Sequence, residues 1–262
     1  MLQDENAAIA SVNKAWESTF KIMLGRSIGP IDDYEAYLQK FVDPYRLEKS
    51  AISGKTVVVT GDYGAGARFI SGDEIGEYAK AVGNSRLDIN QIKDMDSVIG
   101  AIGERICYSG SDILGNSGQV ALSNRVVDST FVYKAHDVFY SKYVAYTYLS
   151  KYSEYIFGGH SVGKGTHFGA KIFETYESSR IWEGVHIYLS QDIIYSSNME
   201  NCQNCLFCFN LRSKRRCIGN LELPADKFAA LKEKLQSEIA ETLRAKRTAK
   251  SIVEIVGRDL NG

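Results

Sequence analysis

Between Ser111 and Ile156 the sequence repeats with a period of six residues. Every third position is either small or aliphatic, and the two kinds alternate with the single exception of Ser150. The aliphatic positions are Leu114, Val120, Val126, Val132, Val138, Val144 and Ile156, and the small ones are Ser111, Ser117, Ser123, Ser129, Ala135, Ser141, Thr147 and Ser153. Such a repeat arises when each coil of a solenoid sends equivalent positions into a narrow shared interior, where like side chains stack.

The pattern resumes one residue out of phase at Ser178 and continues to Cys208. We therefore expect a mostly β protein whose centre, residues 111–208, is a single-stranded β-solenoid with an insertion at residues 157–177. The 16 tyrosines and only 3 prolines agree with this expectation, because tyrosine favours half-buried pleated surfaces. The equal spacing of small and aliphatic positions leaves the handedness and the coil length open.

The segments on either side of the repeat have different sequence patterns. Residues 1–110 resemble an α/β region, with helical spacing at residues 10–24 and 34–42, a strand at Thr56–Thr60 and a helix that starts near Ser71. Residues 221–262 predict a C-terminal helix and tail, in which Pro224 starts the helix. Its apolar stripe is formed by Phe228, Leu231, Leu235, Ile239 and Leu243.

The composition narrows the class of protein. The net charge of −1 argues against a broad nucleic-acid or membrane footprint. The polar N-terminus lacks the basic start and apolar run of a signal peptide, and no apolar stretch approaches the length of a membrane span. We therefore expect a cytoplasmic protein that is not secreted by a signal peptide and does not contact a membrane.

Four of the five cysteines cluster near the end of the repeat. Cys202, Cys205, Cys208 and Cys217 have the spacing C-x2-C-x2-C-x8-C. Four thiolates so close together suit a tetrahedral structural zinc, so residues 202–220 predict a zinc knuckle. Cys202 is the weakest ligand candidate, and the alternatives are buried free thiols or a redox or iron–sulfur role.

The segment Asn204–Asn220, followed by a charged helix, resembles the C-terminus of an uncharacterised β-solenoid family. Its members occur in metagenomic bacterial and phage genomes and have Ser/Cys-rich repeats that end in a Cys-x2-Cys-x8-Cys zinc knuckle. The resemblance covers roughly residues 111–240. It implies a zinc-capped solenoid and no activity, and the phage members add a virion to the expected locations.

Two weaker motifs lie in the expected insertion. Gly158–Thr166 nearly matches a phosphate-binding loop, but Gly165 stands where the magnesium-binding Ser or Thr should be, which favours a flexible loop. His160 and His167 could bind a metal or act as acid and base, although no nucleophile can be assigned beside them.

These patterns favour a non-enzymatic structural or assembly protein, because the informative residues specify stacking and capping. We expect protein partners or self-assembly, with the apolar stripe of the C-terminal helix or a solenoid flank buried against another chain. The first alternative is a nucleic-acid-binding module that uses the basic side chains of the knuckle. These are Arg212, Lys214, Arg215 and Arg216. The second alternative is an enzyme with a site in the His160–His167 loop.

Overall fold

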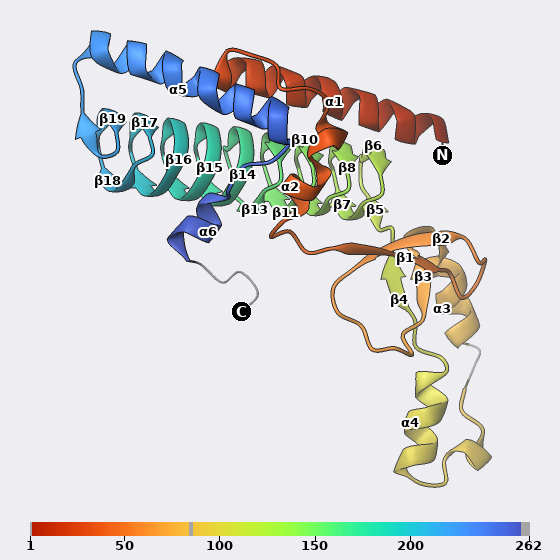
Figure 1. The fold of residues 1–262 in the computed structure, drawn as a ribbon. Coiled ribbons are helices and arrows are strands. Elements are labelled where there is room, and N and C mark those ends of the chain that lie inside the picture. The colour runs from red at the N-terminus through yellow and green to blue at the C-terminus, as the bar shows by residue number, and fades with distance from the viewer. Residues whose placement is uncertain (1, 84–85, 258–262) are drawn as a thin grey trace.

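The computed structural model describes residues 2–83 and 86–257. Its main body is a rod of stacked β-coils, and helices α1 (Leu2–Leu24) and α5 (Ala225–Lys246) lie along one side of the rod (Figure 1). A smaller unit projects from the N-terminal end of the rod (Figure 1). The prediction of a mostly β protein is confirmed, since the rod is a β-solenoid of about nine turns with helices at both termini.

Each coil contains two of the repeats that are visible in the sequence. The parallel register shows this, because Lys142 aligns with Glu154 and Val144 with Ile156. The short strands of the first coils are β5 (Ile113–Leu114), β6 (Gly118–Ala121), β7 (Asn124–Val127), β8 (Thr130–Tyr133), β9 (His136–Phe139), β10 (Lys142–Ala145), β11 (Tyr148–Lys151), β12 (Glu154–Phe157) and β13 (His160–Val162). The later coils are formed by β14 (His167–Tyr176), β15 (Ser179–Tyr188), β16 (Gln191–Glu200), β17 (Gln203–Leu206), β18 (Phe209–Arg212), β19 (Arg215–Ile218) and β20 (Leu221–Glu222).

The aliphatic positions of the repeat form the interior, as the sequence predicts. Val132, Val138, Val144 and Ile187 are fully buried. They belong to one continuous apolar cluster that runs along the rod and ends at the cysteines. Each interior residue therefore contacts its counterparts in the coils before and after it.

A left-handed residue precedes each interior position. Tyr140, Tyr143 and Tyr146 have φ values of 51°, 55° and 50°, and the same conformation recurs at nearly every third residue of the solenoid. Because a coil contains two repeats, and each repeat has two such positions, the chain bends four times in each coil. Few of these bends use glycine.

The small positions carry a ladder of hydroxyl groups. The Ser141 hydroxyl donates to the Phe139 carbonyl oxygen at 2.8 Å and accepts the Ser153 N–H of the next coil at 3.2 Å. The Ser141 N–H in turn donates to the hydroxyl of Ser129 in the preceding coil at 3.0 Å. Where serine or threonine occupies these positions, its hydroxyl contributes as well as its size, because it satisfies buried backbone N–H groups.

The structure places residues 157–177 within the coils, which corrects the expected insertion. Glu154 aligns with His167, so this coil holds one residue more than its neighbours, near Gly163. The next coil exchanges small and large side chains. Gly169 aligns with Ile156 and Ile181 in an aliphatic column, while Ile172 aligns with Gly184 in a small column. A Cβ atom on Gly169 would lie 2.4 Å from Ile172 Cδ1, so the glycine makes room for the isoleucine.

The predicted C-terminal helix is α5, and its stripe packs on the same chain. Phe228 and Leu243 are buried in a cluster with α1 and with outward-facing solenoid residues such as Phe157 and Trp182. Leu235 and Ile239 are partly buried there, and Leu231 is exposed. The stripe therefore does not need another chain to cover it.

The expected region 1–110 divides into two parts. Helix α1, the 3-10 turn η1 (Ile31–Tyr34) and α2 (Glu35–Gln39) pack on the solenoid, as does α6 (Ile252–Val256) from the C-terminal segment. Residues 45–110 form the projecting unit. Its elements are β1 (Tyr45–Lys49), β2 (Thr56–Thr60), β3 (Phe69–Ser71), η2 (Gly72–Glu74), α3 (Ile75–Gly83), η3 (Ile89–Gln91), α4 (Met95–Gly103) and β4 (Tyr108–Gly110).

Removing one hydroxyl of the ladder should destabilise the whole rod. In Ser141→Ala the buried N–H of Ser153 loses its acceptor, and we expect the free energy of unfolding to fall by about 1–3 kcal/mol. Ser213→Ala is the matched control, because the Ser213 hydroxyl bonds the exposed side chain of Asn201. Chemical denaturation measures both. Equal effects of the two variants would contradict the structural role of the ladder.

Candidate functional site

The predicted zinc ligands Cys202 and Cys208 lie in the columns of small residues. The Cys202 N–H donates to the Ser190 hydroxyl and the Cys208 N–H to the Ser196 hydroxyl, both at 3.0 Å. The Cys202 thiol donates to the Glu200 carbonyl oxygen at 3.3 Å, two residues back, as the serines of the ladder do. These cysteines therefore occupy the structural position of a serine.

Cys205 and Cys217 lie in an aliphatic column. Cys205 aligns with Ile193 in the preceding coil and with Cys217 in the following one. A hydrogen bond from Cys205 lowers the pKa of the Cys208 thiol to about 7, and the same bond, together with burial, raises the pKa of Cys205. The solenoid thus brings Cys205, Cys208 and Cys217 into one buried, interacting cluster.

The geometry of this cluster does not amount to a metal centre. Among the residues that the structure describes, no group of three or more His, Cys, Asp or Glu side chains is arranged to hold a metal ion. The four thiols instead fill interior positions of the coils, each directed at a backbone carbonyl oxygen. A zinc knuckle is therefore not shown, and the zinc ion stays a prediction from the sequence.

The C-terminal end of the rod is covered by the chain itself. Strand β20 pairs antiparallel with β19. Beside it, the Asn220 side-chain amide accepts the Phe209 N–H at 2.9 Å and donates to the Phe209 carbonyl oxygen at 3.0 Å. The amide thus replaces the peptide group that a further coil would supply, which protects part of the β18 edge from pairing with another chain.

The basic side chains near this end are partly neutralised. Arg212 pairs with Glu200 at 3.0 Å, and Lys214 pairs with Glu222 at 3.5 Å. Arg215 and Arg216 are exposed on the last coil. Two ion-paired side chains and two exposed arginines make a small basic patch.

The structure does not bring His160 and His167 together. His160 aligns with Tyr148 in the coil before it and Phe173 in the coil after it, whereas His167 aligns with Glu154 and Ser179. The two histidines therefore stand in different columns of the coil. The segment around them is solenoid backbone, and a strand rather than a helix follows the glycines, which differs from a phosphate-binding loop.

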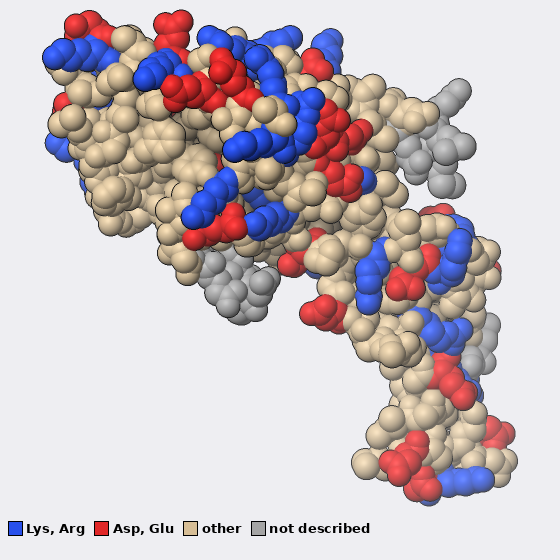
Figure 2. All heavy atoms as spheres, viewed as in Figure 1, with Lys and Arg blue, Asp and Glu red and all other residues tan. Residues whose placement is uncertain are grey.

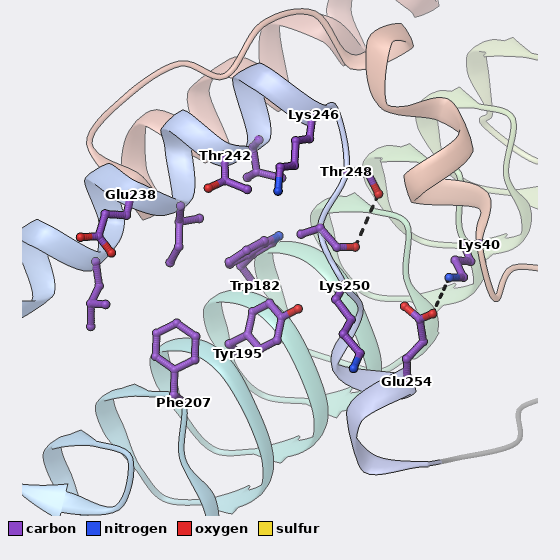
Figure 3. A pocket seen from close by; sticks show the side chains of 14 residues that line it. Lys40, Trp182, Tyr195, Phe207, Glu238, Thr242, Lys246, Thr248, Lys250 and Glu254 are labelled. Carbon is purple, nitrogen blue, oxygen red and sulfur yellow. Dashed lines mark hydrogen bonds and ion pairs between the residues drawn. The ribbon is translucent and has the colours of Figure 1, made fainter.

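A cleft that the sequence did not reveal lies between the solenoid, α5 and the segment after α5 (Figure 3). Its volume is about 710 Å³. Trp182, Tyr195 and Phe207 line its floor and come from three successive coils. Trp182 is 1% exposed, so Tyr195 and Phe207 offer the accessible ring surface. The other lining residues are Leu235, Glu238, Ile239, Thr242, Leu243 and Lys246 of α5, Thr248, Ala249, Lys250 and Glu254 of the C-terminal segment, and Lys40.

A buried carboxylate next to this cleft holds two terminal segments on the rod. Glu183 accepts the Tyr37 hydroxyl of α2, the Ser251 hydroxyl at 2.9 Å and the Ile252 N–H of α6 at 2.7 Å. Burial raises the pKa of Glu183, although these hydrogen bonds and the nearby charge of Lys171 oppose that effect. Because Ser251 follows the cleft residues Thr248–Lys250, Glu183 also positions the rim of the cleft.

Lys171 stands one coil before Glu183 in the same column and is fully buried. Its ammonium group donates to the Lys40 carbonyl oxygen at 2.6 Å. It also lies over the rings of Tyr37, Phe41 and Phe173 at 5.3–5.5 Å. Burial lowers the pKa of Lys171 to about 8. The pair is a buried and chemically perturbed feature of the kind that often marks a functional site.

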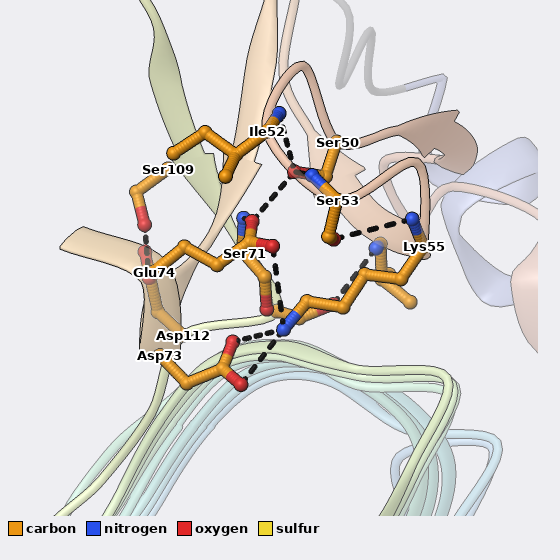
Figure 4. A network of polar contacts seen from close by, with 11 residues as sticks. Ser50, Ile52, Ser53, Lys55, Ser71, Asp73, Glu74, Ser109 and Asp112 are labelled. Atoms are coloured by element: carbon orange, nitrogen blue, oxygen red, sulfur yellow. Dashed lines mark hydrogen bonds and ion pairs between the residues drawn. The ribbon is translucent and has the colours of Figure 1, made fainter. Parts of the chain in front are cut away.

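A second polar network stabilises the projecting unit (Figure 4). Glu74 accepts the Ser50 hydroxyl at 2.6 Å and the Ser71 N–H at 2.8 Å, and Lys55 lies between Glu74 and Asp73. Burial by itself would raise the pKa of Glu74, but these hydrogen bonds and the charge of Lys55 lower it to about 2. The network joins β3 to the loop after β1.

No family model, curated protein or solved structure matches this chain. The resemblance to the metagenomic solenoid family therefore stays a prediction. No helix in the described part of the chain is long and apolar enough to cross a membrane.

Substitution by serine should distinguish stacked thiols from zinc ligands. Cys202 occupies a serine position, so we expect Cys202→Ser to change the free energy of unfolding by less than about 1 kcal/mol. Cys205→Ser places a hydroxyl in an aliphatic column and should cost about 1–3 kcal/mol. Thermal and chemical denaturation measure both variants.

Elemental analysis of protein purified without chelator tests the zinc prediction directly. The sequence predicts about one zinc per chain. A zinc content near one equivalent, together with similarly severe losses in both variants, would contradict the assignment of the thiols to stacking. A zinc content below about a tenth of an equivalent would contradict the zinc prediction.

Acid should weaken the projecting unit before the rod. The folded-state pKa of Glu74, about 2, lies below its ordinary value of 4.5, so the ionised carboxylate stabilises the unit above pH 4.5. This contribution is lost as the pH falls from 4.5 toward 2. The protection factors of the amides in residues 45–83 and 86–110, which correct for the pH dependence of intrinsic exchange, should therefore fall over that range in the wild type, and Glu74→Gln should remove that pH dependence. Glu77→Gln, an exposed residue of α3, should leave it unchanged.

Proposed function

We propose that the protein is a non-enzymatic assembly component that associates with a second copy of itself through residues 89–106. These residues, called the arm below, comprise η3, α4 and the short segment after α4. The arm extends from the projecting unit, away from the solenoid (Figure 1). The observation that supports the proposal is the number of large apolar side chains that the arm leaves in solvent.

The exposed fractions are high along the whole arm. Ile89 is 76% exposed, Met95 74% and Ile99 59%. The remaining exposed apolar residues are Ile92, Ile102 and Ile106, at 52%, 42% and 44%. Within the arm, Ala101 is the apolar residue that is buried. Lone exposed apolar residues are ordinary on protein surfaces, but a contiguous group usually marks a contact surface.

The spacing of these residues places them on one face. Met95, Ile99 and Ile102 are four and three residues apart on α4, and Ile106 is a further exposed apolar residue just after the helix. Asp94 caps α4 by accepting the Ser97 N–H at 2.8 Å, so the helix starts at a defined residue and presents the stripe in a fixed orientation. The apolar core of the projecting unit is small, because its buried cluster consists of Val57, Val59 and Phe69. This core does not cover the stripe on α4.

A second arm is the partner that best complements this surface. The arm holds two basic and three acidic side chains, and Figure 2 shows blue and red spheres together on the projecting part, so it carries no charge excess that would select a nucleic acid or an anionic membrane. Antiparallel pairing of two α4 helices would bring Asp94 and Asp96 of one copy near Arg105 of the other and align the helix dipoles favourably. Such a two-fold contact is self-complementary, as in most homodimers.

The interface would extend beyond α4. A stable contact normally buries more than about 1,000 Å² in total, which a helix of nine residues hardly supplies by itself. Ile75 and Val82 of the neighbouring α3 are 45% and 37% exposed and would add apolar area. The basic patch on the last coil lies at the opposite end of the rod and takes no part in this contact (Figure 1).

Light scattering on the full chain during size-exclusion chromatography tests the proposal. We expect a dimer for the wild type and a monomer for the double variant Met95→Asp/Ile99→Asp, because two carboxylates in an apolar contact are costly to bury. Leu189→Asp is the matched control, because Leu189 is 55% exposed on the solenoid, far from the arm. The Leu189→Asp variant should stay dimeric.

Two results would overturn the proposal. The first is a wild-type monomer at every accessible concentration, and the second is a wild-type dimer that the arm variant leaves intact. Binding of the wild type to lipid vesicles, with loss of binding in the arm variant, would assign the stripe to a membrane surface instead.

A further inference from the structure

We infer that the cleft described above binds a small organic anion with a planar, apolar body. This inference is independent of the arm, because the cleft and the arm are formed by different segments. Three properties of the cleft carry it: its size, its aromatic floor and the unequal pairing of the charges on its rim.

The cleft has the size and lining of a ligand site. A volume of about 710 Å³ falls within the range of roughly 300–1,000 Å³ that is typical of small-molecule sites. The ring centroids of Trp182 and Tyr195 are 5.3 Å apart, and those of Tyr195 and Phe207 are 5.5 Å apart. The three rings form a stepped aromatic surface beneath α5 (Figure 3), and α5 contributes the aliphatic lining residues Leu235 and Ile239. A planar apolar molecule fits between these two walls.

The acidic side chains of the rim are already paired. Glu254 contacts the Lys40 ammonium group at 2.7 Å and accepts the Ser251 N–H at 2.9 Å. Glu238 lies 3.9 Å from Lys234, one turn earlier on α5. Both carboxylates therefore have a cation nearby, and Glu254 also feels the positive charge of Lys250.

Lys246 and Lys250 are the basic residues of the rim that form no ion pair within residues 2–83 and 86–257. They lie on the two sides of the rim, at the end of α5 and in the segment before α6. Figure 3 shows Lys246 extending from α5 toward Trp182. An anionic group placed above the aromatic floor beside Trp182 would pair with the Lys246 ammonium group, while the apolar body covers the rings. Lys250, which extends away from Lys246 on the other side of the rim (Figure 3), adds positive potential without sharing that contact. Charge complementarity therefore selects an anion over a neutral or cationic ligand.

The segment that carries Lys250 is held in place from below. Ser251 and Ile252, the next two residues, donate to the buried carboxylate of Glu183. The rim is thus formed before a ligand arrives, so binding does not have to order this segment.

Two fluorescent probes that differ in one group test the inference. Anilinonaphthalene sulfonate has a planar apolar body and one negative charge, and phenylnaphthylamine is its neutral counterpart. We expect saturable binding of the sulfonate with one site per chain, measured by fluorescence titration and calorimetry. Lys246→Gln/Lys250→Gln should weaken sulfonate binding on the order of tenfold and leave the neutral probe unchanged. Lys227→Gln, an exposed lysine at the start of α5, is the matched control and should have no effect.

Tyr195→Ala should weaken the binding of both probes, because it removes the middle ring of the floor. The titrations are repeated in Met95→Asp/Ile99→Asp, so that binding of the probe to the apolar arm is separated from binding to the cleft. Equal affinities of the sulfonate and the neutral probe would overturn the choice of an anion. The absence of saturable binding, or binding that Tyr195→Ala leaves unchanged, would overturn the site.

Discussion

The solenoid depends on a left-handed residue at every third position. For a residue with a side chain this conformation costs about 1 kcal/mol or more, and here tyrosine, phenylalanine, lysine and glutamate adopt it repeatedly. A single coil could not sustain four such residues. Stacked coils can, because each coil gains a parallel ladder, a filled interior and hydroxyl bonds such as those of Ser141 with the coils on either side. The coils at the ends of the rod have fewer of these contacts, which explains why Asn220 and β20 cover the last one.

The interior of the rod was predictable from the sequence, whereas the length of a coil was not. Alternation of small and aliphatic residues assigns Val132, Val138 and Val144 to the interior whatever the coil length. The two halves of a coil are chemically alike, so only the hydrogen-bonded register, in which Val144 lies beside Ile156, shows that two repeats form one coil. The prediction of an insertion at residues 157–177 was wrong for a related reason. One extra residue near Gly163 shifts the phase of the six-residue repeat. In the next coil Gly169 replaces an aliphatic residue and Ile172 replaces a small one, so the repeat cannot be seen in the sequence although the interior stays filled.

The cysteine spacing illustrates a general ambiguity in this type of fold. Interior positions of the solenoid are three residues apart, and C-x2-C, the usual spacing of zinc ligands, is also three residues. Cys202, Cys205 and Cys208 occupy successive interior positions, so the repeat alone reproduces the spacing of a knuckle whether or not a metal binds. Cys217 follows Cys205 by one full coil and so stacks directly on it. Within a repeat of this period, the spacing of cysteines does not discriminate between a metal site and a packed interior, and the hydrogen-bond partners of the thiols must decide.

The cleft could not be predicted because the residues that form it come from distant parts of the chain. Its floor comes from three coils, its wall from α5 and its rim from the segment after α5, while Lys40 comes from the N-terminal part. What brings these segments together is the buried pair of Lys171 and Glu183. Each charge would be strongly unfavourable alone. Tyr37 of α2 and the start of α6 donate hydrogen bonds to Glu183, and the Lys40 carbonyl oxygen just after α2 accepts one from Lys171, so the pair is tolerated only while both segments are docked. The same electrostatic requirement that ties the two ends of the chain to the rod therefore sets the shape of the cleft above it.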